Sequence, residues 1–315
     1  MIRNPSVAGY FYPGSKNELR ETVARYIDKN APKVEAVGLL APHAGYQYSG
    51  AVAGATISRV NFKDTFIIMG PTHSGLGKPF SVMPEGTWRT PLGDVEVDAV
   101  LARKIIDLSE YAEADYAAHE DEHAVEVQLP FLQYLKPDVR IVPIILAGAA
   151  VTIYKEIGHA IAAAIKETGH EAVLLASGDM THREPASVAK EKDMKAVAAM
   201  LALDEDELTR LYHNLHITMC AHGPVATLIV AAKELGATGG ELVKYMNSGD
   251  ATGDFGPYLQ QPPINPVENS STIAATAAAG VGWTYDSTTG AIKAVVSSAM
   301  ATKLGLDTTN DVVTY

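Results

Sequence analysis

Cysteine is almost absent from this chain, and positive charge is scarce. The one cysteine, Cys220, cannot form an intrachain disulfide, so it is an inert buried thiol, a nucleophile or a metal ligand. Lys and Arg total 25 against 37 Asp and Glu, which gives a formal net charge of −12. Because nucleic acids and anionic membranes repel an acidic surface, we expect neither of them as a main partner.

Long apolar runs and targeting segments are also missing. No apolar stretch reaches the roughly 18 residues that a membrane-spanning helix needs. Residues 1–14 hold no basic segment followed by an apolar run, so the sequence predicts no signal peptide. We therefore expect a cytoplasmic protein without a membrane partner.

What is present predicts a folded α/β protein. The 315 residues, 47% hydrophobic and 20% charged, can bury a sizeable core and fit one large domain. Short apolar runs alternate with longer segments of helical spacing, which predicts a mostly parallel central sheet flanked by helices. The expected strands are 36–41, 65–70, 140–146, 172–177 and 242–247. The expected helices are 49–60, 98–108, 124–135, 152–168, 184–203 and 224–235.

The composition changes after Gly256. Four prolines follow in close succession: Pro257, Pro262, Pro263 and Pro266. They predict a loop without regular structure. Residues 271–315, rich in Ala, Thr, Ser, Gly and Val, are read as a strand, a helix and a frayed end. We therefore divide the chain into an α/β domain at 1–257 and a divergent C-terminal segment at 258–315, which we expect to pack on the same domain.

Polar residues follow three of the expected strands at the point where each strand ends. His43 follows the first, His73 follows the second, and Asp179 and His182 follow strand 172–177. Ligands of open parallel sheets bind beyond the carboxyl ends of the strands, where loops from neighbouring strands converge. A lone histidine after a strand is usually an ordinary loop residue. Three such placements together favour a site at this edge.

A second histidine pair lies in an acidic stretch. His119 and His123 are four residues apart, so on one helix they would share a face, and with Glu120 they match the zinc-protease pattern His-Glu-x-x-His. The carboxylates equally suit the start of a helix, where they favour the helix dipole. No third ligand is evident, so the protease interpretation is a minor alternative.

Cys220 stands just before an apolar helical segment. The N-terminus of a helix stabilises a thiolate, which is the form that binds a metal or attacks an electrophile. The alternative is a small buried hydrophobic residue, which is the usual state of a lone cysteine.

With these segments in hand, the chain resembles the Memo family, of the AmmeMemoRadiSam system protein B type. The matching stretches occur in order over roughly residues 3–257: Ala41-Pro42-His43-Ala44-Gly45-Tyr46, Gly70-Pro71-Thr72-His73, Trp88-Arg89-Thr90-Pro91-Leu92-Gly93, residues 122–132, Ser177-Gly178-Asp179-Met180-Thr181-His182 and Met219-Cys220-Ala221-His222-Gly223-Pro224. Two departures stand out. Residues 258–315 match nothing in the family, and Ala124 stands where serine is common.

The Memo family is in turn similar to class III extradiol dioxygenases of the protocatechuate type, which hold Fe(II) with two histidines and a carboxylate. The resemblance implies that His43 and His73 are metal ligands and that Cys220 stands in the place of the carboxylate. It also implies catalytic roles for His123 and for His182, which takes the acid–base position, with Asp179 on the same loop.

The function implied is a non-heme, metal-dependent, dioxygenase-like oxidoreductase acting on a small-molecule substrate. Fe(II) is the expected ion, and Cu or Zn would suit the same His/His/Cys set. Two other functions stay open: a non-catalytic adaptor that uses the same pocket, and a metal-free hydrolase in which His222 or a distant histidine activates Cys220. By analogy with family gene neighbourhoods, a radical-SAM or AMMECR-type protein is an expected partner.

Overall fold

The computed structural model describes residues 1–252, 273–274, 283–285, 292–296 and 312–314. Its centre is a six-stranded sheet. The strand order is β2 (Gly38–Ala41), β9 (Ala172–Ser177), β3 (Thr65–Pro71), β8 (Arg140–Leu146), β4 (Phe80–Val82) and β7 (Glu113–Ala114). The strands β2, β9, β3 and β8 are mutually parallel, whereas β4 runs antiparallel to β8. The predicted mostly parallel sheet is confirmed.

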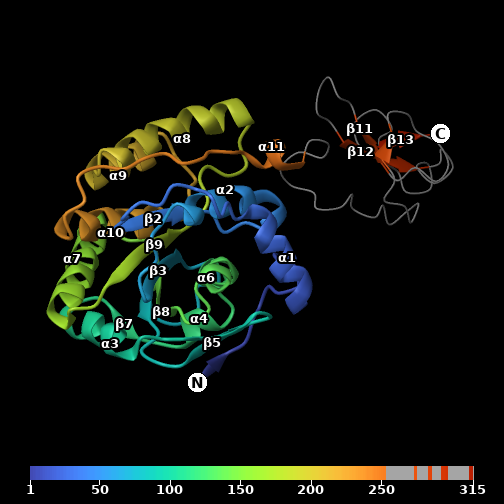
Figure 1. Ribbon diagram of the computed structural model, residues 1–315. Helices are drawn as coiled ribbons and strands as arrows, with labels where there is room; N and C mark the ends of the chain where they lie inside the picture. The colour runs from blue at the N-terminus through green and yellow to red at the C-terminus, as the bar shows by residue number, and fades with distance from the viewer. Residues whose placement is uncertain (253–272, 275–282, 286–291, 297–311, 315) are drawn as a thin grey trace. The chain divides into compact units, whose positions relative to one another are not determined.

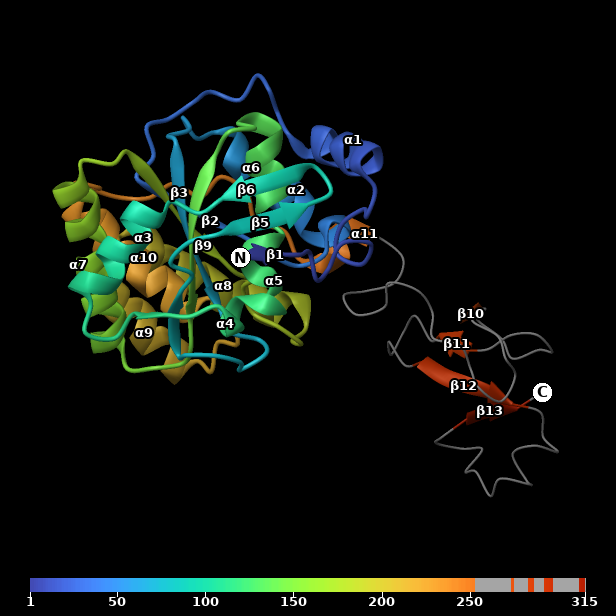
Figure 2. The same ribbon diagram turned by 90° about the horizontal axis from the view of Figure 1, so that it is seen from below.

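Helices cover both faces of this sheet, as Figures 1 and 2 show. One face carries α3 (Ala99–Leu108), α7 (Val151–Thr168) and α10 (His222–Glu234), and the other carries α2 (Tyr46–Ser58) and α6 (Leu129–Leu135). Strands buried on both faces need continuous apolar runs, which is why β3 and β8 stood out in the sequence. Within the described part of the chain, no helix combines the length and apolarity needed to span a bilayer.

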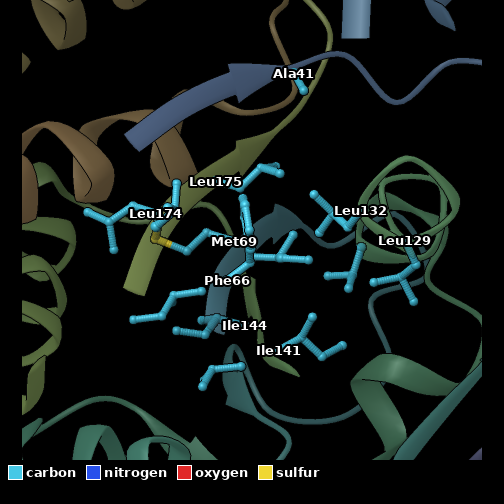
Figure 3. Packing of buried hydrophobic residues seen from close by; sticks show 14 of the residues in the cluster. Ala41, Phe66, Met69, Leu129, Leu132, Ile141, Ile144, Leu174 and Leu175 are labelled. Atoms are coloured by element: carbon cyan, nitrogen blue, oxygen red, sulfur yellow. The ribbon is translucent and has the colours of Figure 1, made fainter. Parts of the chain in front are cut away.

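The remaining elements surround this core. The helices are α1 (Lys16–Tyr26), α4 (Ala117–Glu120), α5 (His123–Glu126), α8 (Ala186–Leu201), α9 (Glu205–Asn214) and α11 (Ser248–Thr252). A small sheet joins β1 (Ile2–Arg3), β5 (Thr87–Thr90) and β6 (Gly93–Glu96). Figure 3 shows the main core, where side chains of β3, β8 and β9 meet Leu129 and Leu132 of α6.

Four of the five predicted strands form, and Leu242–Asn247 does not. This segment pairs with no strand in the described part of the chain. The Tyr245 hydroxyl donates to Asp193 on α8, and Leu242 is 44% exposed. The apolar residues of this segment therefore belong to a stretch without regular structure that contacts α8, and the strand prediction was wrong.

The helix predicted at 124–135 is two helices, α5 and α6. Pro130 lies in the first turn of α6. Inside a continuous helix its ring would clash with the carbonyl of Glu126, so α5 ends at that residue. The other five predicted helices form with ends shifted by a few residues, while α1, α9 and the short helices α4 and α11 were missed.

The chain divides into two compact units, residues 1–251 and 252–315. In the second unit, β10 (Ile273–Ala274), β11 (Trp283–Tyr285), β12 (Ile292–Val296) and β13 (Val312–Thr314) form a four-stranded sheet. The predicted proline loop, and the helix and end expected within 271–315, fall largely outside the described residues.

Gly158 offers a test of the packing between α7 and α10. A Cβ atom there would lie 2.8 Å from the Thr227 carbonyl oxygen and 2.9 Å from the Val230 Cβ. Overpacking costs about 1–3 kcal/mol, whereas alanine gains about 1 kcal/mol of helix propensity. We expect Gly158→Ala to lower the free energy of unfolding by up to about 2 kcal/mol in urea titrations.

Gly148→Ala is the matched control, because a Cβ at that position meets no atom within 4 Å. It should change the unfolding free energy by less than about 0.5 kcal/mol. Equal stabilities of the two variants would contradict the close helix contact.

Candidate metal centre

Three neighbouring strands deliver their following loops to one edge of the sheet. The strands β2, β9 and β3 lie side by side, and they are followed by His43, Asp179 and His73 respectively. Parallel strands end at the same edge, so the three loops meet although they are far apart in sequence. The helix α5 contacts β3 and adds His123 to this edge.

Three imidazoles form the centre of the site. The nitrogen atoms that His43, His73 and His123 offer all lie within 4.8 Å of one another. The ring centroids of His73 and His123 are 4.4 Å apart and stacked, and His43 stands edge-on to both rings at 5.0 and 5.1 Å. His43 is buried, with 2% exposed, whereas the side chains of His73 and His123 are 37% and 17% exposed.

Glu122 holds His73 in place. This carboxylate is 0% exposed and accepts hydrogen bonds from the His73 backbone N–H (2.6 Å), the His73 Nδ1 (2.8 Å) and the Ala124 backbone N–H (2.9 Å). Burial alone would raise its pKa, but these hydrogen bonds outweigh burial and lower the pKa of Glu122 to about 2. The carboxylate is ionised, so Nδ1 carries the proton of His73 and Nε2 keeps a free lone pair.

Ser177 fixes the tautomer of His43 in the same way. Its hydroxyl donates to the Ala124 carbonyl (2.6 Å) and accepts from the Gln128 side-chain amide (2.8 Å). The single hydroxyl proton is thus engaged, and the contact of 3.3 Å with His43 Nδ1 must be donated by the ring. His43 therefore also presents an unprotonated Nε2.

Cys220 lies directly in front of that nitrogen. The distance from Cys220 Sγ to His43 Nε2 is 3.3 Å, and Sγ accepts the backbone N–H of Asp179 at 3.2 Å. The Asp179 carboxylate accepts the backbone N–H groups of His43 (3.0 Å) and Ala44 (3.3 Å). Asp179 thus braces both the histidine and the thiol.

The thiol is neutral in this environment. Burial, followed by the charge of Asp179, raises the pKa of Cys220 to about 12, and burial lowers the pKa of His43 to about 4. The helix N-terminus that follows Cys220 does not outweigh burial and the nearby carboxylate, so the pKa of the thiol stays raised. A bound cation would reverse this balance.

Two other predicted residues lie apart from the imidazole group. His182 is exposed, and its Nδ1 lies 2.9 Å from the carbonyl oxygen of Thr218, two residues before Cys220. His222 Nε2 contacts the Thr209 hydroxyl at 3.0 Å, and Cys220 Sγ makes no described contact with His222. The Cys220–His222 pair considered for a hydrolase is therefore not formed.

The zinc-protease interpretation is wrong. His119 and His123 belong to separate short helices, α4 and α5, and do not share a face. His119 is fully buried beside Trp88 and contacts the Ser81 hydroxyl at 3.3 Å. Its role is structural packing.

The N-terminal segment braces α5 from the other side. Buried Arg3 pairs with buried Glu126 and donates to the backbone carbonyls of His119 and Glu122. The Tyr12 hydroxyl also donates to Glu126. This network holds the helix that carries His123.

Three supporting residues were missed in the sequence: Glu122, Gln128 and Ser177. Glu122 was interpreted only as an acidic residue at a helix start. All three fall within or beside the stretches that carry the family resemblance, which was the available signal.

Comparisons with known proteins agree with this resemblance. A family described as Memo-like protein matches residues 3–256. A MEMO1 family protein of Pyrobaculum aerophilum is 42% identical over 264 residues, covering 80% of this chain and 94% of the relative. One from Methanopyrus kandleri is 39% identical over 269 residues, covering 81% and 95%. A solved structure of an uncharacterized Escherichia coli K12 protein aligns with a TM-score of 0.40 and 16% identity, over 54% of this chain and 75% of that one.

Replacing Glu122 tests the support of His73. In Glu122→Gln the amide must place N–H groups against backbone or ring N–H donors, which leaves buried groups unpaired. We expect the free energy of unfolding to fall by about 2–4 kcal/mol in denaturant titrations. Asp121→Asn removes the same charge from an exposed neighbour and should change it by less than about 0.5 kcal/mol. Equal effects would contradict the role assigned to Glu122.

Proposed function

The chain belongs to the Memo family, and from that premise we propose that it is a non-heme, metal-dependent oxidoreductase of dioxygenase-like type. The proposed mononuclear site is held by His43, His73 and Cys220. One observation carries the proposal: His43 and His73 have nitrogen atoms within 4.8 Å of each other at the carboxyl edge of the sheet, and a thiol lies 3.3 Å from His43 Nε2.

The donor set suits a borderline or soft ion. Two imidazole nitrogens and one sulfur favour Fe(II), Cu or Zn over Mg²⁺ or Ca²⁺, which prefer oxygen. The resemblance to ring-cleaving dioxygenases favours Fe(II) among these. The donor atoms that lie within 4.8 Å of one another belong to His43, His73 and His123, whereas Cys220 is described in contact with His43 alone of these three. His123 is therefore a further candidate donor.

When bound, such an ion supplies Lewis-acid and redox chemistry. The protein's contribution is to present the donors in the right protonation state. Glu122 and Ser177 keep the protons of His73 and His43 on Nδ1, and Cys220 must release its proton as the ion binds, so affinity rises with pH. Asp179 holds both His43 and Cys220 in place, because its carboxylate accepts the His43 backbone N–H and its own backbone N–H donates to Cys220 Sγ.

Two further histidines are assigned to proton transfer. Burial lowers the pKa of His123, so its ring is neutral and can accept a proton from a substrate. His182 Nδ1 donates to the Thr218 carbonyl, which leaves Nε2 as a base facing away from that contact. The substrate is proposed to be a small molecule. A radical-SAM or AMMECR-type protein partner is proposed by family analogy alone.

The close Cys220–His43 pair also suggests a cysteine nucleophile, but its electrostatics do not favour one. Reactive cysteines need a lowered pKa or a charged histidine partner. Here burial keeps both members neutral. The pair suits metal binding better than attack by a free thiol.

Metal analysis after anaerobic purification tests the proposal. We expect about one iron, copper or zinc ion per chain in the wild type, and less than about a tenth of that in His43→Ala and Cys220→Ala. The control is His216→Ala, which removes an exposed histidine outside the imidazole group and should retain the ion.

Full retention of the ion by both His43→Ala and Cys220→Ala would overturn the ligand assignment. A wild-type chain that binds no ion under these conditions would favour the adaptor alternative.

A further inference from the structure

A cavity of about 770 Å³ opens beside the candidate metal centre. His73 and Cys220 line it on the side of the metal centre, and Tyr154, Tyr212 and His222 line it further along. Its volume is in the range of small-molecule sites. None of its lining residues is Asp, Glu, Lys or Arg, although these types make up 20% of the chain. Without a metal ion, the side chains of the cavity offer an ionised ligand no fixed counter-charge.

The wall formed by α7, α9 and α10 is built of rings. His222 stacks on Tyr212 with ring centroids 4.2 Å apart and an interplanar angle of 10°. Tyr154 stands edge-on to His222 at 5.8 Å. The Tyr154 hydroxyl is fully used, because it accepts from the Ala149 N–H and donates to the Ala147 carbonyl. Tyr154 therefore offers a ligand its ring only.

Hydrogen bonding fixes the tautomer of His222. The Thr209 hydroxyl donates its only proton to the Glu205 carbonyl at 2.7 Å. It must then accept from His222 Nε2, which lies 3.0 Å away. Nε2 therefore carries the ring proton, and Nδ1 is a hydrogen-bond acceptor.

That acceptor has no protein donor. His222 is only 6% exposed, and within residues 1–252 no described group pairs with its Nδ1. Nδ1 is not among the fully buried side-chain atoms without a partner, so it keeps access to the cavity that His222 lines. A bound molecule with an O–H or N–H group can supply the donor that the described protein groups do not.

We propose that this cavity binds an uncharged, ring-bearing small molecule whose O–H or N–H group donates to His222 Nδ1, with the ligand ring packed against Tyr154 and Tyr212. His222 is then a specificity-determining residue. As an account of substrate recognition this rests on the proposed function, but as an account of binding it does not require a metal ion.

The test compares phenol with anisole, which has the same ring but no donor, on the full chain after chelation of metal. Calorimetric titration should give a phenol-to-anisole affinity ratio that is about 3- to 10-fold higher in the wild type than in His222→Phe. His222→Asn, whose amide oxygen stands near the position of Nδ1, should recover part of this ratio. His216→Phe, in the same wall, should leave the ratio unchanged.

A direct measurement on the wild type keeps the test valid if a variant fails to fold. Long-range proton–nitrogen spectra of the histidine rings should show His222 protonated at Nε2, with Nδ1 shifting on addition of phenol and not of anisole. A protonated Nδ1, equal ratios in wild type and His222→Phe, or no phenol binding would each overturn the proposal. Metal content, measured in parallel, tests the metal centre separately.

Discussion

The ion pair and hydrogen bonds of one buried carboxylate hold the site together. Glu122 accepts the backbone and ring N–H groups of His73, which follows β3, and the Ala124 N–H in the first turn of α5, so it ties a strand end to a helix start. A buried anion is tolerated when it is paired and hydrogen-bonded. The same contacts that keep the charge buried also orient His73 and place His123 beside it.

Proton positions at the site follow from hydroxyl groups with a single proton each. Ser177 gives its proton to a backbone carbonyl and so can only accept from His43, and Thr209 does the same for His222. The two hydroxyls accept from different ring nitrogens, Nδ1 in His43 and Nε2 in His222, so a different nitrogen stays unprotonated in each ring. His43 presents Nε2 to the thiol, while His222 presents Nδ1 to the cavity. One fold thus prepares two imidazoles for different partners.

Much of the fold was readable from the sequence because strands buried on both faces must be apolar throughout. The short strands β4 to β7 were not predicted, because a strand of two to four residues shows no periodic pattern in the sequence. The pairing of such strands depends on tertiary context. The positions of His43 and His73 after apolar strands signalled a site. The approach of Cys220 to His43 spans 177 residues, and local pattern could not predict it; the family resemblance did. The role of Glu122 needed coordinates, since a buried acid and a helix-start acid look alike in sequence.

The docking of Arg3 on Glu126 has a consequence for biosynthesis. Arg3 can meet its partner Glu126 only after the chain has grown past α5, and the thiol of Cys220 follows nearly a hundred residues later. Nascent chains of intermediate length therefore lack the thiol that lies beside His43 in the folded protein. The contact between Cys220 and His43 forms only after most of residues 1–251 have been made.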